Sequence, residues 1–86
     1  MEIGYSNSFR KKYKKLPVKV QDKFNAKLIL FLEDPFNPLL NNHSVHYPYD
    51  GCRSINITGD LRAIYELKEK GLAHFLTIGS HNELYK

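Results

Sequence analysis

The chain carries side chains that could together cleave RNA. They lie in a loop, in a predicted pair of strands and near the end of the 86 residues: His43, His46, Arg53, Asn56, Asp60, Arg62, His81 and Tyr85. Cleavage through the ribose 2′-hydroxyl requires a base, an acid and cations beside the phosphate. Histidine can fill either proton-transfer role near neutral pH, arginine offers a fixed fork of donors, and aromatic rings stack on unpaired bases. The residue types therefore permit this mechanism.

The same residues also have simpler interpretations. His81 could be a turn residue, Tyr85 an aromatic ring that packs the chain end, and Asp60 a common residue of a Gly-Asp turn. His43 and His46, spaced i, i+3, could bind zinc together with a third ligand. The sequence has no HExxH motif and no cysteine pair to support such a site. We therefore expect no metal ion and no cofactor.

Hydrophobic periodicity predicts two helices in the first half of the chain. Ser6 or Ser8 can cap a first helix, in which apolar residues recur at i, i+4 and i+7. Pro17 ends this helix and suits the first turn of a second one, which runs to about Glu33. Residues 35–50 contain three prolines and three asparagines, so we expect a long loop there.

The second half of the chain predicts strands. The segments with strand character are "CRSINIT", "LRAIYELK" and "LAHFLTI" (52–58, 61–68 and 72–78). A three-residue connection at 58–60 keeps one apolar face and one polar face on the first two strands, whereas a two-residue turn would mix them. In this register Asn56 and Arg62 lie side by side, on the face away from the helices.

These elements predict an α+β fold in the order β-α-α-β-β-β. A small antiparallel sheet carries an N-terminal helical hairpin packed on one face. Glu2 to Tyr5 would add a short edge strand, and one helical turn at Glu83–Tyr85 would tuck the end of the chain against the sheet. Residues 1–86 are predicted to form a single domain, because so short a chain cannot build a second core.

The net charge of +4 is unevenly distributed along the chain. Residues 1–34 contain eight Lys and Arg residues but only four Asp and Glu residues. Residues 35–86 contain five basic and five acidic residues. A basic half indicates either a polyanionic partner or lysines that keep an exposed helix soluble.

We expect a cytoplasmic protein on three grounds: the lone Cys52, an apolar run at Leu28–Leu32 that is too short to span a membrane, and the lack of a signal-peptide pattern.

Three segments carry a resemblance to a known family: "YSNSFRKKYKKL", "GCRSINITGDLRAIYEL" and "IGSHNELY". With them the chain resembles the RelE/ParE superfamily of type II toxin–antitoxin toxins, and within it the YafQ-like mRNA interferases. Members of this family have a histidine about ten residues before an arginine of the first long strand. His43 and Arg53 have this spacing here. Members also have an aspartate at the position of Asp60 and a Gly-[Ser/Thr]-His-x-x-Leu-[Phe/Tyr] ending, as at Gly79–Tyr85.

The resemblance implies a RelE-like toxin domain and a function. Such toxins cleave mRNA in the ribosomal A site, without a metal or cofactor, until a cognate protein antitoxin blocks them. The implied roles are proton transfer by His81 and Asp60 with assistance from His43, phosphate binding by Arg53 and Arg62, and nucleotide stacking by Tyr85. The implied partners are the antitoxin, the ribosome and mRNA; neither a membrane nor a small-molecule cofactor is expected.

Asn56 departs from the family pattern, because YafQ-like members often carry a histidine at this position. Asparagine can hydrogen-bond a ribose or a phosphate but cannot transfer a proton at neutral pH, so activity would be weaker unless His46 compensates.

Two other functions stay open. A ParE-like toxin would bind DNA gyrase without cutting RNA, which leaves His43, Asp60 and His81 without an evident role. An inactive module would retain only the surface that binds the antitoxin.

Overall fold

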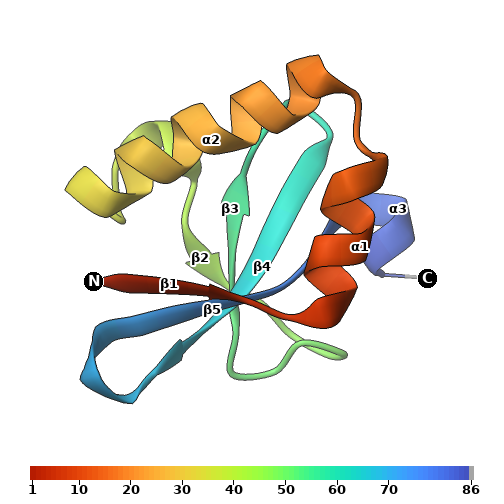
Figure 1. Ribbon diagram of the computed structural model, residues 1–86. Coiled ribbons are helices and arrows are strands. Elements are labelled where there is room, and N and C mark those ends of the chain that lie inside the picture. The colour runs from red at the N-terminus through yellow and green to blue at the C-terminus, as the bar shows by residue number, and fades with distance from the viewer. Residues whose placement is uncertain (86) are drawn as a thin grey trace.

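The computed structural model describes residues 1–85, and of Lys70 only the backbone. Its elements are β1 (Glu2–Tyr5), α1 (Asn7–Lys15), α2 (Val18–Glu33), η1 (Pro38–Leu40), β2 (His43–Ser44), β3 (Arg53–Asn56), β4 (Leu61–Lys68), η2 (Glu69–Gly71), β5 (Leu72–Ser80) and α3 (His81–Leu84). The strands form one sheet in the order β1-β5-β4-β3-β2 (Figure 1). No helix among residues 1–85 has the length and apolar character needed to cross a membrane.

The structure confirms the predicted α+β fold. The hairpin of α1 and α2 packs on one face of the sheet, and its apolar residues share one core with β3, β4 and β5. The sheet is mixed rather than wholly antiparallel, because β1 runs parallel to β5, with Glu2 opposite Leu72 and Tyr5 opposite Phe75. The last helix begins at His81, two residues before the predicted final turn.

Ser6 joins the start of α1 to β5. Its Oγ accepts a hydrogen bond from the backbone N–H of Phe9 at 3.0 Å and donates one to the carbonyl of Leu76 at 2.6 Å. Its own N–H donates to the carbonyl of Phe75 at 2.9 Å. Of the two N-cap candidates, Ser6 is therefore the cap and Ser8 lies within α1, and Pro17 separates the two helices as predicted.

Aromatic rings fill the space between the helices and the sheet. The ring of Phe75 on β5 lies at the centre of this cluster and is fully buried. Its centroid is 5.4 to 6.1 Å from those of five other rings, which belong to Tyr5, Phe9, Phe24, Phe31 and Tyr65. Pairs at these separations add about 0.5–1.5 kcal/mol beyond the burial of their area. The cluster therefore anchors both helices to β5.

The β3–β4 hairpin has the register predicted from its alternation. Ile55 lies opposite Ala63 and Asn56 opposite Arg62, as a three-residue connection at 58–60 requires. Ile55 and Ala63 are fully buried in the core beneath the helices. Because successive strand residues point to opposite faces, Asn56 and Arg62 face away from the helices.

Residues 35–50 contain more structure than the loop predicted there. They include η1 and the short strand β2, which pairs antiparallel with β3. The chain then crosses the outer face of the sheet, where a second small core forms from Val45, Cys52, Ile64 and Leu84. This second core holds the segment after β2, the middle of β4 and α3 together, and these are the elements that build the cavity described next.

Candidate active site

A cavity of about 460 Å³ opens on the outer face of the sheet. Its walls come from β2 and the residues after it, from β3 and β4, and from α3 with the residue that follows it. The lining residues are His43, Ser44, Val45, His46, Tyr47, Ser54, Arg62, His81 and Tyr85. The structure thus brings together four of the predicted site residues, His43, Arg62, His81 and Tyr85, and adds His46.

Strand β2 positions His43. The residue pairs with Ser54 of β3, so its backbone is fixed at the edge of the sheet. The Nδ1 atom of the ring lies 2.7 Å from the carbonyl oxygen of Asn41. The side chain is otherwise exposed and borders the cavity. An exposed imidazole held by one ring nitrogen is well placed for proton transfer.

Helix α3 presents His81 and Tyr85 to the cavity. Their i, i+4 spacing places both rings on one side of the helical turn, with centroids 4.9 Å apart. Tyr85 also meets the ring of Tyr49 edge-on, at 5.8 Å. Burial raises the pKa of the Tyr85 phenol, and the Tyr49 phenol adds to the effect, so this ring is neutral at neutral pH. A neutral aromatic ring beside an imidazole is suited to stacking on a nucleotide base.

A capping box fixes the start of α3. The backbone N–H of Glu83 donates to Ser80 Oγ at 3.2 Å, and the N–H of Ser80 donates to Glu83 Oε1 at 2.8 Å. Each bond satisfies a backbone donor that the first turn of a helix leaves free. The bond from the Tyr85 N–H to the His81 carbonyl, at 3.0 Å, closes the same turn.

We expect Ser80→Ala to destabilise α3 by about 0.5–2 kcal/mol, because it removes the N-cap acceptor. The backbone amide hydrogen of Tyr85 should then exchange with solvent faster, and hydrogen-exchange NMR measures the increase in its exchange rate. Ser8→Ala is the matched control, since Ser8 lies exposed within α1 rather than at its cap, and it should leave this amide unchanged. Equal exchange in both variants would contradict the assigned cap.

Arg62 supplies the positive charge of the cavity. Its Nη1 donates to the carbonyl oxygens of Thr58 and Gly59, both at 3.2 Å. These bonds hold the guanidinium against the turn that joins β3 to β4. A planar guanidinium held in this way keeps further N–H donors in a fixed geometry, which suits the oxygens of a phosphate.

Asn56 and Asp60 do not line the cavity. Asn56 is the cross-strand neighbour of Arg62, as predicted, and its buried Oδ1 has no hydrogen-bond partner among residues 1–85. Asp60 is exposed in the turn. It directly precedes Leu61, whose partner on β5 is Ser80, so the turn lies at the end of the sheet where α3 begins. Asp60 is therefore near the cavity mouth rather than within it.

Arg53 lies away from the cavity. Its Nε donates to Asn42 Oδ1 at 2.8 Å, and its guanidinium carbon is 5.2 Å from the centroid of the Phe36 ring. By the two-residue period of a strand, Arg53 lies on the same face of β3 as Ile55, which is buried beneath the helices. The structure does not bring it beside Arg62, because Asn42 and Phe36 hold its guanidinium on that side.

We expect Arg53→Ala to lower the free energy of unfolding by about 1–3 kcal/mol, because it removes a charged hydrogen bond and a cation–π contact. Urea denaturation measures the change. The control is Arg10→Ala, which removes an exposed arginine with one long hydrogen bond, 3.4 Å from Nε to the Tyr5 carbonyl, and should cost under about 0.5 kcal/mol. Weaker RNA binding with unchanged stability would instead restore the phosphate role predicted for Arg53.

Four further lining residues are not among the candidates named from the sequence: Ser44, Val45, Tyr47 and Ser54. His46, considered from the sequence as a zinc ligand or as a residue that compensates for Asn56, also borders the cavity. Tyr47 is 83% exposed, which is unusual for so large a ring and leaves its face open. His46 and Tyr47 are neighbours in an irregular segment that gives no periodic signal. Only the folded chain therefore shows that they line the same cavity as His43 and His81.

Metal-ligating groups are not clustered in the part of the chain that the structure describes. Among residues 1–85, no three His, Cys, Asp or Glu side chains lie close enough together to hold a metal ion. Although three histidines border the same cavity, their side chains do not converge on one point. The zinc site considered for His43 and His46 is therefore not formed within the described part of the chain.

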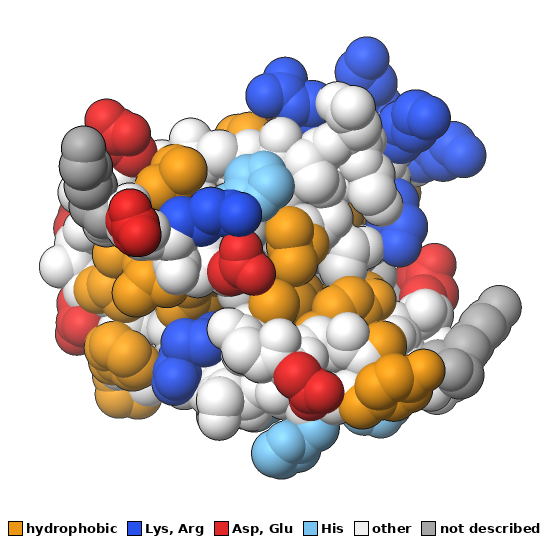
Figure 2. Space-filling view, turned by 90° about the horizontal axis from the view of Figure 1, so that it is seen from below, with side chains coloured by type: hydrophobic (Ala, Val, Ile, Leu, Met, Phe, Trp, Pro, Cys, Tyr) orange, Lys and Arg blue, Asp and Glu red, His pale blue; other side chains and the backbone are white. Residues whose placement is uncertain are grey.

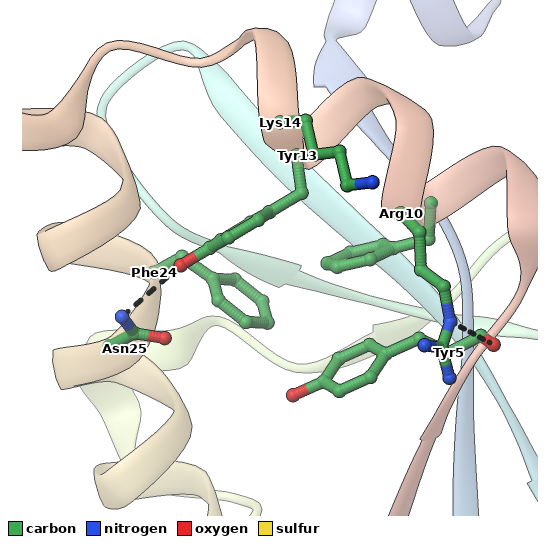
Figure 3. Close-up of a pocket in the computed structure, with 7 residues that line it drawn as sticks. Tyr5, Arg10, Tyr13, Lys14, Phe24 and Asn25 are labelled. Atoms are coloured by element: carbon green, nitrogen blue, oxygen red, sulfur yellow. Dashed lines mark hydrogen bonds between the residues drawn. The ribbon is translucent and has the colours of Figure 1, made fainter.

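A second cavity, of about 340 Å³, lies between α1, α2 and β1 (Figure 3). Its lining residues are Tyr5, Phe9, Arg10, Tyr13, Lys14, Phe24 and Asn25. The Asn25 amide donates to the Tyr13 hydroxyl at 3.2 Å across it, and aromatic rings form its floor. It has no histidine and no carboxylate, so it cannot supply an acid and a base near neutral pH. The cavity on the outer face is the candidate active site.

Basic side chains gather at one corner of the molecule (Figure 2). Figure 2 shows Lys and Arg concentrated at one corner of the face seen from below, on the side where Figure 1 has α1 and α3. Lys12 of α1 reaches β5, where its Nζ donates to Thr77 Oγ1 at 2.8 Å. A cationic surface of this kind favours a polyanion such as RNA.

Solved structures of bacterial toxins share this fold. YafQ from E. coli strain BL21(DE3) superposes with a TM-score of 0.82 at 22% identity, covering 99% of this chain and 98% of that one. The YoeB/ParE toxin from Agrobacterium tumefaciens gives 0.78 at 18% identity, covering 94% and 99%. The E. coli DinJ–YafQ complex gives 0.69 at 22% identity, covering 99% and 98%. The chain thus has the fold of small RelE-like toxins.

The sequence places the chain within this class. The model of the family described as bacterial toxin of type II toxin-antitoxin system, YafQ, matches residues 1–86. The chain therefore belongs to the YafQ family of type II toxin–antitoxin toxins. No curated protein matches it by sequence.

Proposed function

We propose that this toxin is an endoribonuclease that cleaves mRNA in the ribosomal A site. The observation that carries the proposal is the cavity lined by His43, His46 and His81 together with Arg62 and Tyr85. Imidazoles supply an acid and a base at neutral pH, and the guanidinium supplies positive charge for a phosphate. Membership of the YafQ family supports the same activity.

The proposed reaction is attack of a ribose 2′-hydroxyl on the adjacent phosphorus. A base takes the proton of the 2′-oxygen, this oxygen bonds to phosphorus, and the bond to the 5′-oxygen breaks as an acid protonates it. The products are a 2′,3′-cyclic phosphate and a 5′-hydroxyl. His81 keeps its predicted proton-transfer role, whereas His43 and Asp60 exchange theirs, because His43 lines the cavity and Asp60 does not. Asp60 assists from the adjacent turn, Arg62 binds the phosphate, and Tyr85 stacks on a base. The scheme requires no metal ion.

The proposed partners are the ribosome with its mRNA and a cognate protein antitoxin. E. coli YafQ has been solved with DinJ bound, which supports a protein partner of this kind. The exposed lysines of α1, among them Lys11 and Lys15, suit contact with phosphates of ribosomal RNA. We further propose that residues 1–86 act as one domain and that the toxin acts in the cytoplasm, where translation takes place.

Inhibition of DNA gyrase is the alternative, since the fold also resembles a YoeB/ParE toxin. One assay with three substrates separates the two: ribosomes programmed with a defined mRNA, the same mRNA alone, and gyrase with relaxed plasmid. We expect cleavage of ribosome-bound mRNA at codon-phased positions, with cyclic-phosphate ends. Cleavage should be unchanged by phenanthroline with Mg²⁺ present. Intact mRNA together with inhibited supercoiling would favour the gyrase alternative.

A further inference from the structure

Asn41 has a backbone conformation that directs its carbonyl group toward the active-site histidine on β2. It follows η1 and adopts the left-handed region, with φ 46° and ψ 48°. Among residues 1–85 it is the one non-glycine residue with positive φ. Asparagine tolerates this region better than most residues do. The resulting reversal brings the Asn41 carbonyl oxygen to 2.7 Å from Nδ1 of His43.

The residues on both sides of Asn41 hold it in place. Leu40 is fully buried in the main core. The side-chain amide of Asn42 is bonded at both ends: Nδ2 donates to the Tyr65 hydroxyl at 2.8 Å and to the Pro35 carbonyl at 2.9 Å, while Oδ1 accepts from Arg53 Nε at 2.8 Å. With both flanking residues anchored, the orientation of the Asn41 carbonyl group is fixed.

This contact determines which nitrogen of His43 carries the proton. A carbonyl oxygen can only accept a hydrogen bond, so Nδ1 must be the donor at this distance. In the neutral ring the lone pair then lies on Nε2. An unconstrained histidine side chain favours the opposite tautomer, with its proton on Nε2. The contact with Asn41 therefore reverses the ordinary preference and leaves a basic nitrogen for a group in the cavity.

We propose that Asn41 is a positioning residue that holds His43 in the Nδ1–H tautomer, and that His43 is thereby the base of the reaction. The inference rests on the proposed function, which left acid and base unassigned. Nε2 takes the 2′-hydroxyl proton, the 2′-oxygen bonds to phosphorus, and His81 gives a proton to the departing 5′-oxygen. As His43 becomes charged, its bond to the Asn41 carbonyl becomes charge-assisted and stronger.

The tautomer can be measured without any activity. Long-range ¹H–¹⁵N NMR spectra of the full chain, labelled at histidine and recorded above the range in which histidine titrates, distinguish protonated from unprotonated ring nitrogens. His43→Gln identifies the signals of His43. In the wild-type protein we expect a protonated Nδ1 and an unprotonated Nε2. A wild-type His43 with its proton on Nε2, or an even mixture, would overturn the inference whether or not the protein cleaves RNA.

Two variants test the role of Asn41. Asn41→Gly keeps the left-handed conformation accessible, whereas Asn41→Val opposes it because a β-branched residue is a steric outlier there. We expect the glycine variant to keep the wild-type tautomer and a cleavage rate within about threefold. The valine variant should lose both, with a rate lower by about tenfold or more, the factor by which the conformation is disfavoured.

Equal tautomers and equal rates in the two folded variants would overturn the positioning role. Should Asn41→Val fail to fold, the wild-type spectrum alone still decides the tautomer. Lack of cleavage by the wild-type toxin on programmed ribosomes would reject the proposed function and with it the role of His43 as base. The position of the proton on His43 would still be settled by the spectrum, so the two failures are distinguishable.

Discussion

Replacing His81 by alanine is expected to lower the rate of mRNA cleavage by about 10²–10⁴-fold and to leave the protein folded. Removing a positioned general acid or base eliminates a rate factor of this size. His81 is exposed in the first turn of α3, and Leu84 is the residue that anchors this helix in the second core. Single-turnover cleavage of ribosome-bound mRNA measures the loss, and circular dichroism reports the fold.

Asn82→Ala is the matched control for His81, since Asn82 is the next residue of α3, is exposed and does not line the cavity. It should keep a cleavage rate within about twofold of the wild type, because surface substitutions of this kind change stability by about 0.5 kcal/mol or less. Comparable rates for the two variants would remove His81 from the reaction. Growth arrest by His81→Ala with intact mRNA and broken chromosomal DNA would point to gyrase.

Replacing Phe75 by alanine is expected to cost about 3–5 kcal/mol of stability, as deletion of a fully buried phenylalanine ring does. Its ring contacts the aromatic side chains of both helices, of β1 and of β4, so the cavity left behind cannot collapse without moving several elements. At roughly 0.05–0.15 kcal/mol per residue, the whole chain has about 4–13 kcal/mol of stability. The variant should therefore be partly unfolded at 37 °C.

Urea denaturation followed by circular dichroism or tyrosine fluorescence measures this loss, since the chain has no tryptophan. Phe36→Ala is the control, because Phe36 is 63% exposed and its side chain contacts Arg53 from outside the core. We expect it to cost about 1 kcal/mol or less. If the urea concentrations at the unfolding midpoint were similar for Phe75→Ala and Phe36→Ala, the aromatic cluster would not be the main source of stability.

Features that depend on neighbouring residues could be predicted from the sequence. The N-cap at Ser6, the break at Pro17 and the pairing of Asn56 with Arg62 all follow from local patterns: a capping side chain, a missing backbone donor and the two-residue period of a strand. The cluster of His81 and Tyr85 likewise follows from one helical turn.

Features that depend on distant segments could not be predicted in this way. Phosphate binding was expected of Arg53, but the direction of its guanidinium depends on Asn42 and Phe36, which come from an irregular segment without periodicity. The second core also joins three separate parts of the chain, at Val45, Ile64 and Leu84. His46 and Tyr47 border the cavity only because this core holds their segment against the sheet.

The pairing of β1 with β5 bears on the biosynthesis of the toxin. Ser6 is bonded to Leu76, 70 residues later, and contacts of such separation form late because a long loop must close first. A growing polypeptide lacks the partner of β1, and the ring of Phe75, until β5 has left the ribosome. His81 emerges later still. The fold and the cavity on its outer face are consequently incomplete until β5 and α3 have emerged.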